Sequence, residues 1–420
     1  MKTAVIGFPR VGTLRELKFA SERYFRKEIA REELLQTARE LRKRHWEVQK
    51  QAGVDHISSN DFSFYDITLD TAALLGIVPE RYRKLKLSTL DTYFAMARGY
   101  QGESGDVKAL AMKKWFNTNY HYIVPEVEDD MIIELSGDKL FAEYKEAKAL
   151  GIETKPIVVG PYTMLKLCRY TGSKKAADFT DAFVNVYKQI IEKCETQGVL
   201  WLQIEEPALV QDMSKEDIAL FHKIYDVLLS VSDSCKILLQ TYFGDVRDIY
   251  KDLIAMPFAG IGLDFLEGKK TAALVEEYGY PSDKILFAGL VNGKNIWKNH
   301  YERTLKVIRN LREKDINVVL STSCSLLHVP YTLQHEHKLA KEYLEHFAFA
   351  EEKLTELKEL GKLADCKDYT KEAEYQKNYA LFEQDRNCNN EAVKSRLAKV
   401  TEKDYVRLPE RKERQKLQKK

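Results

Sequence analysis

The amino-acid sequence predicts an α/β protein built on a (β/α)8 TIM barrel. Eight short runs of apolar or β-branched residues recur along the chain, and most are nearly continuous in apolar character, as in parallel strands that are buried on both faces. Helical patterns separate most of these runs, which is typical of a barrel. No Gly-x-Gly-x-x-Gly motif follows the first run, so the rival fold, an open doubly wound sheet, loses its usual support.

The predicted strands follow one another along most of the chain. Each run ends in polar, glycine or proline residues, which commonly end a strand. The strand candidates are residues 4–9, 56–63, 156–161, 200–207, 237–243, 260–265, 285–291 and 317–323. The clearest helical patterns between them cover residues 178–197, 215–231 and 301–314. We expect strand and helix to alternate around a single barrel.

Three regions differ from a minimal barrel, which we place at residues 1–332. An insertion at about 84–150 is rich in lysine, glutamate and aromatic residues, and we expect extra helices and a hairpin there. Residues 333–406 carry long helical patterns with charge pairs spaced for helix faces, so we expect a helical extension packed on the barrel. Residues 407–420 have almost no apolar side chains, and we expect a basic linker or frayed tail.

Composition and charge exclude several classes of protein. The 420 residues are 44% hydrophobic and 31% charged, which rules out a fibrous or wholly disordered chain. The formal net charge of +2 does not favour nucleic acid or a membrane surface as the main partner, and no apolar run reaches the roughly 18 residues that span a bilayer. The N-terminal apolar stretch is too short for a signal peptide, and six widely spaced cysteines indicate a reducing cytoplasm.

Polar residues follow several predicted strands, where a barrel places its active site. Asn60 and Asp61 follow the second strand candidate, and Glu205 and Glu206 lie at the end of the fourth. Adjacent carboxylates suggest acid–base or metal chemistry. Neighbours on a strand point to opposite faces, however, so only one of the two glutamates can face the barrel interior.

The loop after the first strand candidate has the features of an anion site. Thr13 followed three residues later by Glu16 forms a capping box, which predicts a helix that begins at Thr13. Arg15 and Lys18 would share one face close to the free N–H groups of that helix, and Arg10 lies just before it. The alternative is that these cations only solvate the helix or pair with neighbouring acids.

A second dense patch of cations and aromatic residues covers residues 113–122. Lys113 and Lys114 lie beside Trp115 and further aromatic side chains, a combination that could hold a planar, anionic ligand. Such a patch is more often a core or interface cluster.

Residue types that bind metals are sparse. Cys324 and His328 are four residues apart and could share an ion if that turn is helical, but no second cysteine and no His-Glu-x-x-His motif accompanies them. We therefore expect no metal to be bound by this chain.

Seven longer segments of the chain form a recognisable set. They are GFPRVGTLRELK (7–18), SNDFSFYD (59–66), KWFNTNYHY (114–122), VVGPYT (158–163), QIEEPALV (203–210), LVNGKNIW (290–297) and STSCSLLHVP (321–330). Together they resemble the N-terminal half of the cobalamin-independent methionine synthases, in register from about residue 4 to about residue 416.

The resemblance implies an activity, a cofactor and a set of binding residues. Family members transfer a methyl group from 5-methyltetrahydropteroyltri-L-glutamate to L-homocysteine, with two face-to-face (β/α)8 barrels joined by a helical linker. The resemblance places the catalytic zinc in the C-terminal barrel. Zinc is therefore expected in the complete enzyme, and we expect this chain to contain neither a metal site nor catalytic residues. By motif match, the folate polyglutamate tail binds at Arg15, Glu16, Leu17, Lys18 and Lys114. Secondary candidates are Arg10, Asn60, Asp61, Trp115 and Glu206.

The chain stops at Lys420, where that linker would enter the second barrel. Our first hypothesis is therefore an N-terminal half that binds the folate tail, scaffolds a C-terminal catalytic barrel in cis or in trans, and transfers no methyl groups alone. The second is a stand-alone folate-binding or assembly module, and the third is an independent zinc methyltransferase that uses Cys324, His328 and Glu206. Nucleic-acid binding by the basic tail is the fourth, and the near-zero net charge argues against it.

Overall fold

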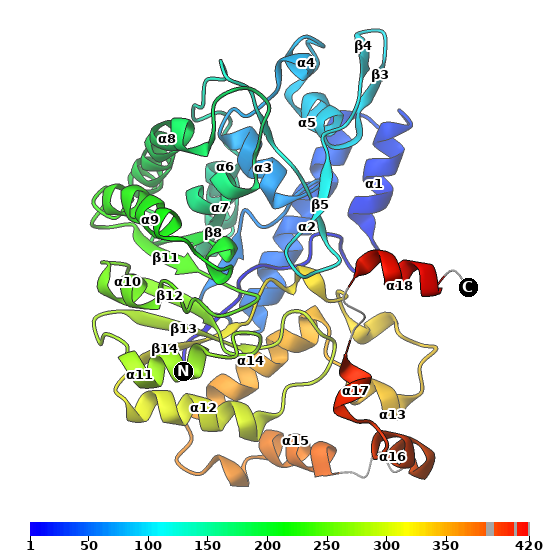
Figure 1. Ribbon diagram of the computed structural model, residues 1–420, viewed down its shortest axis with the longest axis vertical. Helices are drawn as coiled ribbons and strands as arrows, with labels where there is room; N and C mark the ends of the chain where they lie inside the picture. The colour runs from blue at the N-terminus through cyan, green and yellow to red at the C-terminus, as the bar shows by residue number, and fades with distance from the viewer. Residues whose placement is uncertain (384–389, 407–409, 419–420) are drawn as a thin grey trace.

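The computed structural model describes residues 1–383, 390–406 and 410–418, and a barrel of parallel strands lies at its centre (Figure 1). The strands are β1 (Thr3–Ala4), β2 (Ile57–Ser59), β8 (Thr154–Val159), β10 (Trp201–Glu205), β11 (Lys236–Gln240), β12 (Gly260–Asp264), β13 (Ile285–Val291) and β14 (Asn317–Thr322). They pair in the order β1-β14-β13-β12-β11-β10-β8-β2. A parallel bridge between Ala4 and His56 brings the two ends of this sheet together. The predicted (β/α)8 fold is confirmed.

Every predicted strand region contains a barrel strand, but the first strand is shorter than expected. The run at 4–9 forms ladder pairs only at Thr3 and Ala4. Farther along, backbone N–H groups bond to side chains: Ile6 donates to the Thr322 hydroxyl at 3.1 Å, and Phe8 donates to the Asp61 carboxylate at 2.8 Å. The buried run therefore continues as an irregular segment held by its neighbours.

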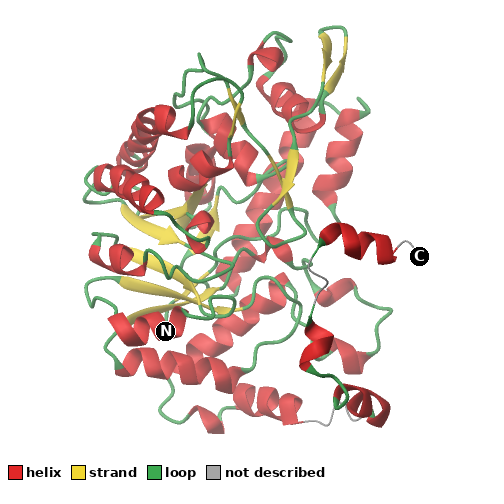
Figure 2. Ribbon diagram, viewed as in Figure 1, coloured by secondary structure: helices red, strands yellow, loops and turns green. Residues whose placement is uncertain are grey.

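Helices surround the strands, as Figure 2 shows. The layer contains α2 (Arg31–Gln51), α6 (Lys139–Ala149), α8 (Ala176–Thr196), α9 (Lys215–Leu228), α10 (Tyr250–Ala255), α11 (Thr271–Tyr278), α12 (Tyr301–Glu313) and α14 (Ala350–Ala364). Helix α14 packs against β1 and β14, so the helical layer of the barrel extends past residue 332. Gly361 permits this close approach, because a Cβ there would lie 3.1 Å from the Thr3 methyl carbon.

The region predicted as an insertion, residues 84–150, contains both added elements and a helix of the barrel. The added elements are α5 (Thr89–Arg98), the hairpin β3 (Tyr100–Gly102)–β4 (Gly105–Val107) and the hairpin β5 (Met112–Lys114)–β6 (His121–Ile123). Helix α6, at the end of this region, packs on β8 and β2. The remaining short elements before α6 and β10 are α1 (Glu16–Phe25), α3 (Ile67–Leu74), α4 (Glu80–Arg83), β7 (Glu126–Val127), α7 (Pro161–Leu167) and β9 (Arg169–Tyr170).

The C-terminal part is helical, and its last segments pack little. It contains α13 (Lys341–Leu344), α15 (Ala373–Glu383), α16 (Glu391–Leu397), α17 (Glu402–Tyr405) and α18 (Arg411–Gln418) (Figure 1). In the region predicted as a basic linker or frayed tail, residues 411–418 form the exposed helix α18, whose Lys, Arg, Gln and Leu residues favour a helix. Residues 407–409 and 419–420 lie outside the described residues. No helix among the described residues is long and apolar enough to cross a bilayer.

An imidazole is sealed into the core between α2 and the rim of the barrel. The His45 ring lies 5.5 Å from the Phe8 ring and 5.6 Å from the Tyr331 ring, measured between centroids. Its Nε2 atom has no hydrogen-bond partner among the described residues. Burial, assisted by the nearby guanidinium of Arg44, lowers the pKa of His45 to about 3. His45 is therefore neutral in the folded protein at any ordinary pH.

This depressed pKa predicts an acid-sensitive fold. The unfolded chain binds a proton at this histidine near pH 6.5 and the folded chain does not, so stability is lost as the pH falls below 6.5. Between pH 7 and about pH 4.5 the wild type should lose roughly 2–3 kcal/mol of unfolding free energy through this histidine. His45→Phe should not show this loss, so its stability relative to the wild type should rise by that amount. Urea unfolding at both values measures this. The exposed His337→Phe is the control, and an equal gain in both variants would contradict the assignment.

Candidate functional site

The loop after β1 is held in a conformation that the sequence pattern does not reveal. Helix α1 begins at Glu16, so the prediction of a start at Thr13 is wrong. Arg15 has a left-handed φ of 64°, and the Glu16 carboxylate accepts a hydrogen bond from the Leu14 N–H at 3.0 Å. Gly12, with a φ of 80°, is required here because a Cβ would collide with the Glu16 carboxylate. Glu16 therefore braces the loop.

The residues of the RELK segment divide into supporting and exposed groups. Glu16 forms an ion pair with Arg44 at 2.7 Å, and the Leu17 side chain is buried against α2 in an apolar cluster. The Arg15 guanidinium is exposed and forms no ion pair with any described residue. The Lys18 ammonium is 3.7 Å from Glu22, and both side chains are nearly half exposed, so this pair is weak. Arg15 and Lys18 are thus the side chains available to a ligand.

The β5–β6 hairpin, which carries Lys114, is tied to the same rim. The Tyr120 hydroxyl donates to the Tyr65 carbonyl at 3.1 Å, and the Ile123 N–H donates to the Asp66 carboxylate at 3.0 Å. Lys114 itself is exposed, and its ammonium is 3.2 Å from the Asn119 side-chain oxygen. Trp115 is only 3% exposed and is a core residue, as the alternative interpretation of this patch holds.

Arg10, Asn60 and Asp61 serve the backbone of the rim. Arg10 donates to the Ser63 carbonyl at 2.8 Å, which links the loops after β1 and β2. Asn60, with a left-handed φ of 61°, donates to the Ile157 carbonyl at 2.7 Å and accepts from Lys139. Asp61 accepts from Phe8, and burial raises the pKa of its carboxyl. Asn60 is buried and Asp61 is half-buried, and these contacts bind both side chains to the protein.

The adjacent glutamates face opposite ways, as the strand geometry predicts. Glu205 points into the barrel, where it accepts from Gln203 and Tyr242, each at 2.8 Å, and burial raises its pKa to about 7. Glu206 points toward α7 and accepts the N–H groups of Tyr162 at 3.0 Å and Thr163 at 2.7 Å. Glu206 is fully buried, so it anchors the start of α7 and has no access to a substrate.

The described residues contain no cluster of three or more His, Cys, Asp or Glu side chains that could hold a metal ion. Cys324 is buried, which raises the pKa of its thiol, and the thiol contacts the Ser325 carbonyl. The His328 ring packs 5.4 Å from the Phe243 ring, and burial lowers its pKa to about 4. Cys324, His328 and Glu206 are therefore not assembled into the zinc site of the third hypothesis.

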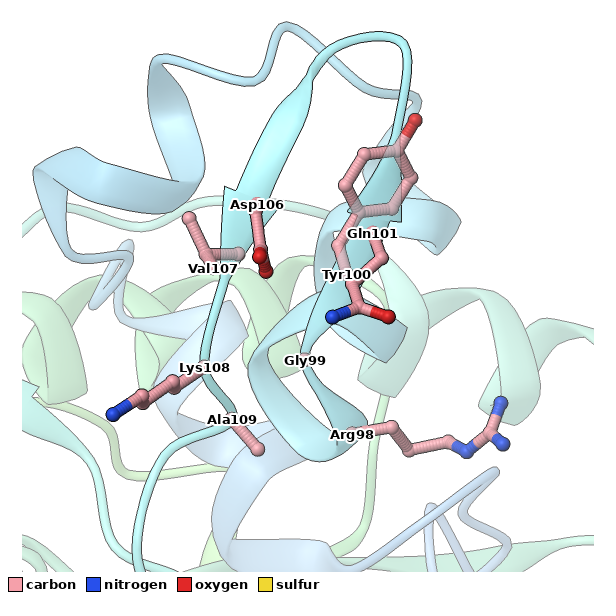
Figure 3. Close-up of a pocket in the computed structure, with 8 residues that line it drawn as sticks. All are labelled: Arg98, Gly99, Tyr100, Gln101, Asp106, Val107, Lys108 and Ala109. Atoms are coloured by element: carbon pink, nitrogen blue, oxygen red, sulfur yellow. The ribbon is translucent and has the colours of Figure 1, made fainter.

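Two open hollows contain residues that the sequence did not single out. One, of about 390 Å³, lies at the base of the β3–β4 hairpin, where the charged ends of Arg98 and Lys108 point apart (Figure 3). The other, of about 380 Å³, lies at the mouth of the barrel between the β5–β6 turn and the segments after β13 and β14. Lys294 lines this second hollow. Its only sequence signal is its place in the segment 290–297.

Residues 2–315 match the family described as "Cobalamin-independent synthase, N-terminal domain". The chain belongs to this family. It is 51% identical, over 97% of its length, to 5-methyltetrahydropteroyltriglutamate–homocysteine methyltransferase of Lactococcus lactis subsp. cremoris (strain SK11). It is also 51% identical, over 100% of its length, to the enzyme of the same name from Campylobacter jejuni subsp. doylei. These matches cover 54% and 55% of the relatives, so this synthase-family chain spans about half their length.

Solved structures of similar fold carry related names. A putative vitamin-B12 independent methionine synthase from Listeria monocytogenes matches 87% of this chain and 98% of its own, with a TM-score of 0.58 and 13% identity. A B12-independent methionine synthase from Shewanella sp. W3-18-1 matches 80% of this chain and 90% of its own, with a TM-score of 0.54 and 14% identity. At these identities the likeness supports only the fold of this synthase-family chain, and not its activity.

The role of Glu206 as an anchor predicts a large loss of stability on its removal. Glu206→Ala leaves the N–H groups of Tyr162 and Thr163 and the Tyr225 hydroxyl without their acceptor. We expect the unfolding free energy to fall by about 3–5 kcal/mol in urea titrations. The exposed Glu192→Ala, on α8, should change it by less than about 0.5 kcal/mol. A comparable change in both variants would contradict the anchoring role.

Proposed function

We propose that this chain is the N-terminal half of a cobalamin-independent methionine synthase. In this role it binds the polyglutamate tail of 5-methyltetrahydropteroyltri-L-glutamate and scaffolds a second, catalytic barrel, in cis or in trans, that methylates homocysteine. The 51% identity to methyltransferases named for that substrate supports the proposal. Because the matches cover about half of those relatives, the activity of the whole enzyme is assigned to the two barrels together.

The distribution of charge at the rim is the observation that carries the proposed binding role. Two of the rim acids are engaged by the backbone: the half-buried Asp61 and the buried Glu206 accept backbone N–H groups. The cations Arg15, Lys18 and Lys114 are exposed, and only Lys18 has an acidic neighbour, at 3.7 Å. A triglutamate tail presents several carboxylates, which Arg can bind through two parallel hydrogen bonds and Lys as a movable point charge. This face is therefore suited to an extended polyanion.

The residues that the structure describes do not fit a catalytic zinc site. No three potential ligand side chains gather within the described ranges, and the Cys324 thiol is buried with a raised pKa, which disfavours the thiolate that zinc requires. Activation of the homocysteine thiol is thus a task for the second barrel in this proposal. The remote tail would supply binding energy that orients the methyl donor there.

Exposed apolar side chains near the C-terminus support the scaffolding role and keep the assembly-module alternative open. Val393 and Leu397 on α16 are 53% and 64% exposed, and Tyr405 and Val406 are 74% and 76% exposed. Consecutive exposed apolar residues mark surfaces that a partner covers. A separate barrel docked by a stand-alone module would use the same surface, and sedimentation of this chain with an isolated C-terminal barrel measures that binding.

The tail site predicts binding that depends on its exposed cations. The chain should bind 5-methyltetrahydropteroyltriglutamate more tightly than the monoglutamate, and Lys18→Met or Lys114→Met should weaken triglutamate binding roughly five- to tenfold. Isothermal titration calorimetry measures both. Lys188→Met is the matched control, because Lys188 is also exposed on a helix, with a glutamate four residues later at 3.9 Å. Equal affinity for the monoglutamate and the triglutamate, together with equal triglutamate affinity in all three variants, would overturn the proposed role.

The division of labour predicts that the chain makes no methionine alone. Incubation with 5-methyltetrahydropteroyltriglutamate, homocysteine and zinc should give no turnover, because the ligands that activate the thiol are absent from the described residues. Adding a separately expressed C-terminal barrel should restore methionine formation. Steady turnover without that partner would favour the independent-methyltransferase hypothesis instead.

A further inference from the structure

The hollow at the mouth of the barrel has a wall organised around Lys294. The Lys294 ammonium is 2.8 Å from the Asn117 side-chain oxygen and 2.9 Å from a Glu267 carboxylate oxygen. The Asn117 amide nitrogen also donates to Glu267, at 3.0 Å. These contacts form a closed triangle, and they hold the ammonium 5.0 Å from the centre of the Phe243 ring. Lys294 is therefore positioned before any ligand arrives.

The groups that remain free at this wall are mostly hydrogen-bond donors. The Lys294 ammonium has three N–H donors and contacts three oxygens, the Asn117 side-chain oxygen and both carboxylate oxygens of Glu267, at 2.8–3.0 Å, so a ligand carboxylate would share these donors with Glu267. The Asn119 side-chain oxygen accepts from Lys114, and no described residue accepts from the Asn119 amide nitrogen. The side-chain oxygens of Asn117 and Asn119 thus each already accept a hydrogen bond from a lysine. A ligand that fits here must bring acceptors such as carboxylate and amide oxygens.

The hollow also offers apolar surface at the right scale. Leu327 and the ring of Tyr120 line it, and the His328 ring stacks edge-on 6.0 Å from the Tyr120 ring. Such surface suits a short chain of methylene groups. The volume of about 380 Å³ is at the lower end of the roughly 300–1,000 Å³ typical of small-ligand sites.

The hollow borders Lys114, one of the cations of the proposed tail site. Asn119 lines it and also contacts Lys114, so the two lysines border one surface. Glu267 balances the charge of Lys294 and Lys114 adds one more positive charge, so this surface favours a single carboxylate beside neutral amides.

We propose that this hollow binds a distal γ-linked glutamate of the folate tail, and that Lys294 is the residue that reads tail length. A γ-glutamyl unit supplies the features that the wall requires: one carboxylate, amide oxygens and two methylenes. The inference rests on the proposed tail-binding function and extends it from a charged surface to a defined subsite. Lys294 positions the tail and takes no part in methyl transfer.

The test compares tail lengths in the full chain. Dissociation constants for 5-methyltetrahydropteroyl mono-, di- and triglutamate are measured by calorimetry for the wild type, Lys294→Met, Leu327→Trp and Lys166→Met. Lys294→Met removes the ammonium, and Leu327→Trp fills the hollow without changing charge. Lys166→Met is the matched control, because Lys166 also pairs with a carboxylate, at 2.6 Å, beside an aromatic ring. Far-UV circular dichroism confirms that each variant is folded.

We expect Lys294→Met and Leu327→Trp to weaken triglutamate binding roughly tenfold and to leave monoglutamate binding unchanged. Lys166→Met should match the wild type at every length. If the wild type prefers the triglutamate but both hollow variants retain that preference, the subsite is wrong and the proposed function stands. An equal loss at every tail length would also overturn the subsite. A wild type that does not distinguish tail lengths would instead overturn the proposed function.

Discussion

Buried carboxylates that accept backbone N–H groups hold the rim of this barrel together. Asp61 fixes the segment after β1, and Glu206 fixes the start of α7. Asp264 binds the N–H groups of Phe243, Leu266 and Glu267, at 2.8–3.0 Å. Asp66 joins α3 to the β5–β6 hairpin. Burying a carboxylate is costly unless it is well bonded, so each of these contacts determines where its loops lie.

This use of the acids leaves the rim with a particular electrostatic character. Several of its carboxylates are turned inward, and burial raises the pKa of Asp66 and Glu205 to about 7 and that of Asp264 to about 6. Exposed Arg and Lys side chains meet the solvent on the loops that those acids position. Exposed cations thus gather on these loops in a chain whose net charge is close to zero.

The sequence predicted the barrel well but not the conformation of the loops at its mouth, for physical reasons. Parallel strands buried on both faces leave continuous apolar runs, so the strand regions were identifiable. The start of α1 was not identifiable, although Thr13 and Glu16 have the spacing of a capping box. Arg15 is left-handed and the Glu16 carboxylate accepts from the Leu14 N–H, so the helix begins at Glu16 instead. The mouth hollow joins residues about 200 positions apart, from 117 to 328, and no local pattern encodes such a meeting. Motif resemblance predicts a role for Lys114, which is exposed, whereas Leu17 and Trp115, named by the same motifs, are buried.

The closure of the barrel has a consequence for biosynthesis. Thr3 and Ala4 pair with Leu320 and Ser321, and helix α14, which covers them, ends at Ala364. The first strand therefore leaves the ribosome long before its partners exist, and such distant pairings slow folding. Until then the nascent chain carries an unpaired strand edge that nearby hydrophobic segments could capture. The barrel can thus close only after β14 has emerged, and its seam is covered only after α14 has followed.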